Sequence, residues 1–298
     1  MVTVQRDPDI NISTSLRAYV YGPGDATSRL QQGEFWRATL TPHGPASLRI
    51  TWGTETLTAT GWGPGGEWAE LQAEAMAGLL DPGFTFADDS HQRILIGQRA
   101  CRGHRFGASH TLYHELLPNV LGQRVTATQA FQQWRVLCNK LGEVAPGPDV
   151  SLRLPPTPER LLDHPSWWFH PLGIEGKRAE ALRTVARYAS RIDEWSRLGA
   201  AEASAKLLLL PGIGPWTVAV AAGPALGDAD TVPVGDFHIP HEVCWGLAGE
   251  PRGTDARMLE LLEPYRGNRR RAIHYLAAGG PAKPKFGPRQ SIQPIHKW

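Results

Sequence analysis

One apolar stretch constrains the fold more than any other: Leu207-Leu-Leu-Leu-Pro-Gly-Ile-Gly-Pro-Trp-Thr-Val-Ala-Val-Ala-Ala222. Its composition predicts an apolar helix, a short turn around Ile213 and a second apolar helix. Proline favours the first position of a helix, so Pro215 marks where the second helix begins. Glycine favours the position just beyond a helix end, and Gly212 follows the first helix closely. The stretch therefore predicts two helices joined by a tight hairpin.

The glycines of this turn indicate an anion-binding site. Gly212 and Gly214 flank Ile213 and leave the amides of the turn without side-chain cover. Such amides at a helix N-terminus, together with the helix dipole, favour an anion such as a DNA phosphate. A Gly-x-Gly pair alone usually marks an ordinary turn. The complete pattern through Thr217, with apolar Ile213 expected to anchor the turn in the core, favours contact with nucleic acid.

A single acid follows the hairpin. Asp236 lies 20 residues beyond Trp216, in the otherwise uncharged and largely apolar segment 231–240. A carboxylate in such a segment needs a compensating interaction. One interpretation is the cap of a helix that begins near Phe237, because aspartate is a favoured capping residue. Taken together with the hairpin, the spacing favours the other interpretation, a functional carboxylate.

The first 88 residues predict a small α+β domain. Runs with strand-like alternation are separated by Gly and Pro turns, and a run with helical spacing follows them. Packing that helix on one face of the sheet would close the domain. The expected strands span 12–20, 35–40, 47–52 and 57–60, and the expected helix spans 67–80.

Residues 89–280 predict a mostly α-helical region, because the hydrophobic period becomes helical. Thr126 begins a capping box with Gln129, and the apolar residues that follow recur every three to four positions. A Pro- and Gly-rich segment, 145–158, is expected to loop out. Further helices are expected at 159–162, 177–192, 200–209, 255–263 and 268–278. Residues 281–298 are basic and proline-rich, and we expect them to form a tail.

Charge and composition narrow the function classes. The net charge of +2 is unevenly divided: residues 1–88 hold 5 Lys and Arg against 10 Asp and Glu, and residues 89–298 hold 26 against 19. Polyanion binding is therefore expected in the second part. No run approaches the roughly 18 to 20 apolar residues that span a membrane. The first residues lack the pattern of a secretory signal, which predicts a cytoplasmic protein. The three cysteines are odd in number and far apart, unlike a disulfide framework or a metal-ligand set.

The hairpin followed by Asp236 resembles the helix-hairpin-helix DNA glycosylase superfamily, and most closely its 3-methyladenine DNA glycosylase II (AlkA-like) branch. The resemblance extends over most of the chain. Three further segments are similar to motifs of that branch: Leu121-Gly-Gln-Arg-Val-Thr, Pro171-Leu-Gly-Ile-Glu-Gly-Lys-Arg-Ala and Pro264-Tyr-Arg-Gly-Asn-Arg-Arg-Arg-Ala-Ile-His-Tyr-Leu. The acidic first unit resembles the TATA-binding-protein-like (TBP-like) domain that precedes the helical part in this branch.

The resemblance implies a role for each matching residue. Asp236 would be the catalytic carboxylate, and Trp216, Trp168 and Tyr275 would form the base pocket. Residues that would contact DNA are Gln123, Arg124, Gly212, Ile213, Gly214 and Thr217. Gln123 and Arg124 occupy the position that fills the gap left in the base stack. The run Arg269-Arg270-Arg271 would be a phosphate contact or a solvated face.

The implied activity is the flipping and hydrolytic excision of alkylated purines of the 3-methyladenine type from duplex DNA. The implied partner is double-stranded DNA with damaged bases, bound by a nucleoid-associated monomer. Relatives that also cleave the backbone carry a lysine where Trp216 stands, so the enzyme would be monofunctional. No metal or cofactor is implied, apart from a monovalent cation that hairpin carbonyls can hold. The alternatives are a glycosylase for oxidised or deaminated bases and a non-catalytic DNA-binding module, and retention of Asp236 favours an enzyme.

Overall fold

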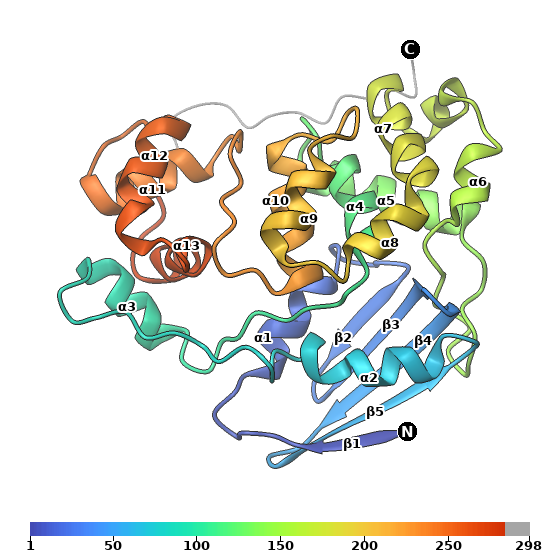
Figure 1. The fold of residues 1–298 in the computed structure, drawn as a ribbon, viewed down its shortest axis with the longest axis horizontal. Coiled ribbons are helices and arrows are strands. Elements are labelled where there is room, and N and C mark those ends of the chain that lie inside the picture. The colour runs from blue at the N-terminus through green and yellow to red at the C-terminus, as the bar shows by residue number, and fades with distance from the viewer. Residues whose placement is uncertain (284–298) are drawn as a thin grey trace.

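The computed structural model describes residues 1–283, and its first part is built on a five-stranded antiparallel sheet (Figure 1). The strands are β1 (Val2–Gln5), β2 (Ser28–Gln31), β3 (Glu34–Thr41), β4 (Gly44–Trp52) and β5 (Thr56–Trp62), in the order β1-β5-β4-β3-β2. Helices dominate the rest of the described chain. The predicted α+β unit followed by a helical region is confirmed at this level. The likeness of the first unit to a TBP-like domain stays a prediction.

One face of the sheet is covered by the helix α2 (Gly66–Met76). Leu48 and Ile50 alternate along β4 and face the helix, as the period of a half-buried strand requires. The helix lies very close to the sheet, because a Cβ on Gly61 would come within 2.1 Å of the Gly66 carbonyl oxygen. The shared apolar cluster contains Phe35, Leu48, Ile50, Leu57, Ala69, Ala73 and Met76.

The prediction of a strand at residues 12–20 is wrong. This segment forms the helix α1 (Ile12–Leu16) and a 3-10 turn, η1 (Arg17–Tyr19). The side chain of Asn11 caps the helix by accepting a hydrogen bond from the Thr14 amide. Ile12, Leu16 and Tyr19 are buried at a spacing of four and then three, which is a helical period. The two edge strands, β1 and β2, were not predicted.

The segment 145–158 does not loop out into solvent. Ala145, Leu152 and Leu154 are buried against Trp36 and Ala38 of β3, on the sheet face opposite α2. An isolated bridge pairs Val144 with Arg153, and the Arg153 amide donates to the Ala26 carbonyl. A segment distant in sequence therefore covers the second face of the sheet.

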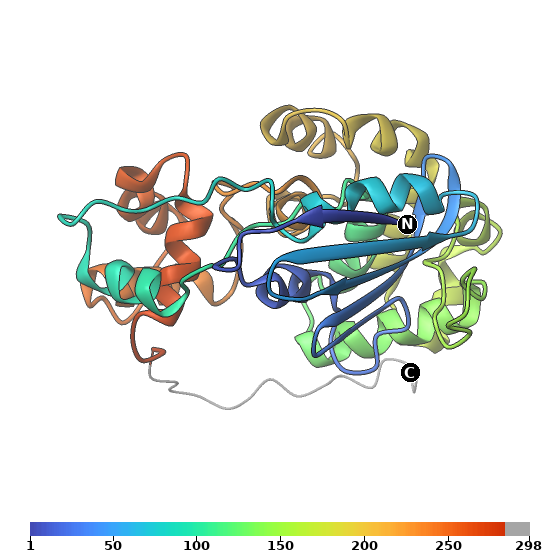
Figure 2. The ribbon, with the colours of Figure 1, turned by 90° about the horizontal axis from the view of Figure 1, so that it is seen from below.

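The helical region contains two separate apolar cores. Its helices are α3 (Gln92–Ala100), α4 (Leu112–Leu121), α5 (Ala127–Leu141), α6 (Pro158–Leu162), α7 (Gly176–Arg187), α8 (Ala189–Trp195), α9 (Ala200–Leu207), α10 (Pro215–Leu226), α11 (Ile239–Ala248), α12 (Asp255–Leu262) and α13 (Arg269–Ala278). Helices α4, α5 and α7 to α10 share one core, and α3 packs with α11 to α13 around the other. Figures 1 and 2 show the second group as a lobe beside the first.

Several predicted helices are found and others differ. The capping residue Thr126 accepts from the Gln129 amide, and the apolar stripe of α5 is buried. The helix expected at 177–192 is broken at Tyr188 into α7 and α8. Helix α4 was not predicted, because it is buried on nearly all sides, so it has no polar face to reveal its period. Residues 284–298 of the expected tail lie outside the described residues.

No helix within residues 1–283 has the length and apolar character needed to cross a membrane.

A buried ion pair joins the sheet to the helical region. The side chains of Arg37 in β3 and Glu115 in α4 are 1% and 0% exposed. Nη2 of Arg37 lies 2.6 Å from Oε1 of Glu115. Ser109 and the hydroxyl of Tyr21 also donate to the Glu115 carboxylate. Burial, and then Glu115 itself, raises the pKa of Tyr21 well above its ordinary value, which keeps the phenol a donor. The packing of the helices on the sheet therefore depends on this network.

Glu115→Gln should lower the free energy of unfolding by about 3 to 5 kcal/mol, because it leaves Arg37 buried without a counter-charge. Urea denaturation measures the loss. The double variant Arg37→Met/Glu115→Gln removes both charges and should recover most of the stability. A loss below about 1 kcal/mol in the single variant, the size typical of an exposed pair, would contradict this role.

Candidate active site

The hairpin between α9 and α10 needs glycine at its first turn position. Gly212 has φ +83°, in the left-handed region. A Cβ there would also lie 3.1 Å from the Cβ of Ala181 in α7. Ile213 is 3% exposed and packs in the larger helical core, where Leu210 is also buried. Burial of Ile213 and Leu210 in the larger helical core therefore fixes the position of the hairpin turn.

Gly214 precedes α10 and faces open space. It is the residue before the first helical turn, and a Cβ built on it would meet no atom within 4 Å. Among residues 1–283, the amides of Gly212 and Gly214 have no hydrogen-bond partner in the protein. Free amides at the start of a 12-residue helix provide what an anion requires.

Gln123, in the turn between α4 and α5, is tied to the hairpin. Its Nε2 donates to the Gly212 carbonyl at 3.0 Å and to Thr217 Oγ1 at 2.9 Å. Thr217 is only 2% exposed. Without DNA, the buried hydroxyl of Thr217 therefore holds Gln123, and the expected phosphate contact through Thr217 stays a prediction.

The structure separates Gln123 from its neighbour Arg124. The side chain of Arg124 is exposed, and its φ of +57° is a conformation that costs energy for a non-glycine residue. Arg124 lines a hollow of about 420 Å³ beside the hairpin. The other residues of the hollow are Gln123, Val125, Glu175, Gly176 and Lys177. Of the two residues expected to fill the gap in the base stack, only Arg124 is free of the hairpin.

Asp236 makes the contacts at a helix start that one interpretation predicts and also contacts the hairpin side, while its role as a functional carboxylate stays a prediction. Its Oδ1 accepts from the amides of His238 and Ile239, at 2.7 and 2.9 Å, where α11 begins. Its Oδ2 accepts from the indole Nε1 of Trp216 at 2.8 Å. Trp216 belongs to the first turn of α10. The same carboxylate therefore caps α11 and lies beside the hairpin.

The loop that carries Asp236 is held at several points between α10 and α11. Gly235 has φ +88°, and its amide donates to Asp255 Oδ1 at 3.1 Å. Val232 is buried in the smaller helical core. These contacts place Asp236 while leaving its neighbour Phe237 77% exposed.

Neither Asp255, which holds the Asp236 loop, nor the exposed ring of Phe237 was singled out in the sequence. Asp255 is the first residue of α12, and an acid there is explained by the helix dipole, so no signal pointed to the loop. Phe237 follows Asp236 directly, and exposure of a large aromatic ring becomes apparent only in three dimensions.

Trp168 and Tyr275 lie away from this group. Trp168 stacks on His164 with ring centroids 3.8 Å apart and packs against the larger helical core. Tyr275 is 4% exposed, and its ring meets Phe86 edge to face in the smaller core. In the described part of the chain, neither residue has a hydrogen bond or ring contact to Trp216 or Asp236.

The arginine run on α13 is not a solvated face, because each of its side chains contacts another part of the protein, and its role as a phosphate contact stays a prediction. Arg269 pairs with Asp230 in the loop that leads to Asp236. Arg271 is 1% exposed and donates to both oxygens of Asp81. Arg270 lies over the ring of Phe106, 4.7 Å from its centroid. These arginines connect the smaller helical lobe to the rest of the protein.

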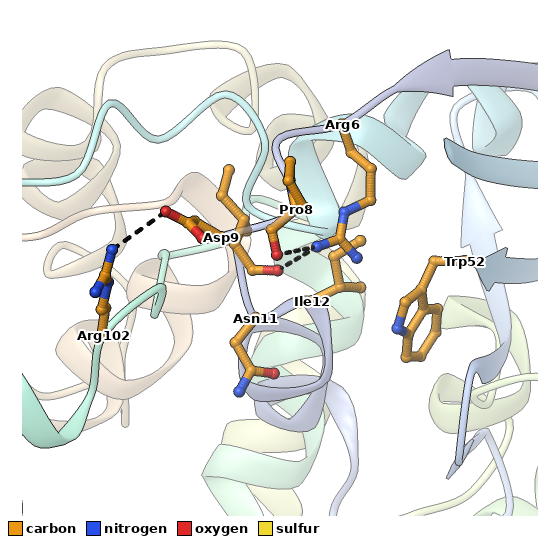
Figure 3. Close-up of a pocket in the computed structure, with 8 residues that line it drawn as sticks. Arg6, Pro8, Asp9, Asn11, Ile12, Trp52 and Arg102 are labelled. Carbon is orange, nitrogen blue, oxygen red and sulfur yellow. Dashed lines mark hydrogen bonds and ion pairs between the residues drawn. The ribbon is translucent and has the colours of Figure 1, made fainter. Parts of the chain in front are cut away.

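Another hollow, of about 390 Å³, is lined by residues of the first unit and by Arg102 of the helical region, and contains none of the predicted site residues (Figure 3). The guanidinium of Arg6 in this hollow donates to the carbonyls of Pro8 and Ile10, so these N–H groups are not available to a ligand.

Among residues 1–283, no group of three or more His, Cys, Asp or Glu side chains is placed to hold a metal ion. His241, near Asp236, accepts from the Gly253 amide.

No protein-family model and no curated protein matches the chain. Its structure is similar to solved DNA glycosylases. A 3-methyladenine DNA glycosylase from Archaeoglobus fulgidus has a TM-score of 0.75 at 17% identity, covering 93% of this chain and 97% of that one. The 8-oxoguanine glycosylase/lyase from Clostridium acetobutylicum gives 0.66 at 12% identity, covering 94% and 99%. The 3-methyladenine DNA glycosylase of Schizosaccharomyces pombe, in complex with abasic DNA, gives 0.53 at 21% identity, covering 63% and 91%. The chain has the fold of the helix-hairpin-helix DNA glycosylases.

Proposed function

We propose that this protein is a monofunctional DNA glycosylase that excises alkylated purines from duplex DNA. The observation that carries the proposal is the hydrogen bond from Trp216 to Asp236, which holds a carboxylate beside a hairpin with free amides. A phosphate gripped at the hairpin would bring a flipped nucleotide within reach of that carboxylate. Two solved structures with this fold are named 3-methyladenine DNA glycosylases, which supports the substrate class.

Asp236 would act at the sugar of the flipped nucleotide. Positive charge develops at C1′ as the glycosidic bond breaks, and a fixed carboxylate stabilises it. The three N–H groups that donate to Asp236 keep the carboxylate in one orientation. The same oxygens can orient the attacking water. Alkylated purines are already cationic and leave readily, so the reaction needs no strong general acid.

The base pocket would be formed around Trp216. Its indole lies beside Asp236, and an electron-rich ring face suits a cationic base. Phe237, the next residue in the chain, adds a second and exposed aromatic ring to the loop that carries the carboxylate. We leave Trp168 and Tyr275 out of the pocket, because Trp168 packs against the larger helical core and Tyr275 is buried in the smaller one.

Arg124 is the residue we assign to the gap in the base stack. Gln123 is held by the hairpin, whereas Arg124 is exposed at the tip of its turn. A guanidinium plane can stack on bases and can also reach a phosphate. Lys177 lines the same hollow and adds positive charge near the hairpin.

The remaining parts of the proposal concern reaction type and partners. Trp216 stands where bifunctional relatives carry the lysine that forms a Schiff base, so we propose hydrolysis without strand cleavage. Similarity to an 8-oxoguanine glycosylase/lyase supports oxidised purines as the second candidate substrate class. We assign no cofactor to the reaction. Binding as a monomer to damaged duplex DNA, and a monovalent cation at the hairpin carbonyls, stay predictions.

Gly214→Leu should weaken binding to damaged and undamaged duplex DNA alike. A Cβ at this position meets no protein atom within 4 Å, and the larger side chain would occupy the space in front of the free amides. Loss of one phosphate contact should raise Kd about tenfold and lower the slope of log K against log salt by about 0.9. Fluorescence anisotropy over a range of salt concentrations measures both quantities.

Gly199→Leu is the matched control. Gly199 precedes α9 in the same way, and a Cβ on it would also meet no atom within 4 Å. It should bind DNA as the wild type does. Equal losses in the two variants, or no loss in Gly214→Leu, would rule out the hairpin as the anchor.

Asp236→Asn should reduce the rate of base excision about 10² to 10³-fold, because the neutral amide cannot oppose the developing sugar cation. The measurement is single-turnover kinetics on a duplex with one alkylated purine. Affinity for undamaged duplex should change little, since the hairpin is intact.

The matched control is Asp228→Asn. Asp228 lies in the same loop, and its carboxylate accepts from the amides of Asp230 and Thr231, as Asp236 accepts from two amides. This variant should keep the wild-type rate. Near-wild-type excision by Asp236→Asn, or an equal loss in Asp228→Asn, would refute the catalytic role.

A further inference from the structure

The side chain of Trp216 contacts two segments that are far apart in sequence: the loop that carries Asp236 and the turn at Gly122. At one edge of the indole, Nε1 donates to Asp236 Oδ2. At the other edge, Cη2 lies 3.1 Å from where a Cβ on Gly122 would be, in the turn that carries Gln123. The side chain is partly buried between these two contacts. Its position is therefore defined on both sides in the protein without DNA.

The donors around Asp236 differ between its two oxygens. Oδ1 accepts two backbone amides, which occupy both of its lone pairs. Within the described residues 1–283, Oδ2 accepts only the indole N–H and keeps one lone pair for another partner. The two amides hold Oδ1 at the start of α11, and the indole fixes where Oδ2 points. Removal of the indole N–H would leave the plane of the carboxylate free to turn about its Cβ–Cγ bond.

We propose that Trp216 is a positioning residue, which acts through its Nε1–H to aim the free lone pair of Asp236 Oδ2 at the reacting sugar. This inference rests on the glycosylase function proposed above. Trp216 lies in the first turn of α10, two residues after Gly214, whose amide and that of Gly212 are free. The element that grips the phosphate therefore also sets the orientation of the carboxylate. This role is distinct from stacking on the base, which needs the ring face and not the N–H.

Trp216→Phe tests the role, because phenylalanine keeps an aromatic face and lacks the donor. The single-turnover excision rate should fall about ten- to a hundredfold, the size expected when a hydrogen bond to a charged group is lost. The Kd for a duplex that contains an abasic-site analogue should stay within about twofold of wild type, a small free-energy change. Trp245→Phe, a partly buried tryptophan of α11, is the control and should keep the wild-type rate.

A double-mutant cycle with Asp236→Asn separates positioning from packing or stacking. If Trp216 acts through Asp236, then Trp216→Phe should cost little further rate in the Asp236→Asn background. An equal loss in both backgrounds would overturn the proposal, and so would a wild-type rate in Trp216→Phe alone. A wild-type rate in Asp236→Asn would instead refute the glycosylase mechanism, so the two failures are distinguishable.

An isosteric replacement keeps the test independent of folding. Benzothienylalanine at position 216 preserves the shape of the indole and replaces its N–H with sulfur. It should lower the excision rate as much as Trp216→Phe does, at an unchanged Tm. A wild-type rate with benzothienylalanine would show that the ring, and not the N–H, is what matters.

Discussion

The hydrogen bond between Trp216 and Asp236 is the contact on which the arrangement of the site depends. It connects the first turn of α10 to a loop that begins in one helical core and ends in the other. The hairpin can be fixed by local chemistry, since Gly212 and Ile213 seat it on the larger core. The carboxylate of Asp236 is held locally by the amides of His238 and Ile239, and its loop is anchored in the smaller core through Val232. The indole N–H brings these two independently held parts to one place.

Much of the positive charge of the second part serves to hold the protein together. Arg271 is buried against Asp81, Arg269 pairs with Asp230, and Arg178 is 1% exposed and bonded to the Leu121 carbonyl. The excess of cations in the sequence therefore overstates the charge available to a polyanion. Near the hairpin, Arg124 and Lys177 remain exposed. In the proposed function, attraction of DNA to this surface would depend on a few cations together with uncharged amides at a helix end.

The sequence predicted features that are encoded locally. The hairpin and its buried Ile213 follow from Pro and Gly positions within a short segment, and the cap at Thr126 is equally local. The strand expected at 12–20 failed because the turn Asn-Ile-Ser-Thr can also cap a helix, and only burial against α2 shows the helical period. Tyr275 and the arginines beside it matched a motif, yet contacts between distant segments, which no local pattern encodes, placed Tyr275 in the smaller core and Arg271 in a buried pair with Asp81.

The most direct test of the central claim is the identity of the bases that the wild-type protein releases from DNA. Methylated and oxidised genomic DNA would be incubated with the protein, and the released bases separated by chromatography. We expect 3-methyladenine from the methylated DNA, as a free base, with the abasic strands left uncut. Release of 8-oxoguanine alone would contradict the proposed substrate class. Release of no base from either DNA would contradict the assignment of Asp236 and the hairpin to a glycosylase site.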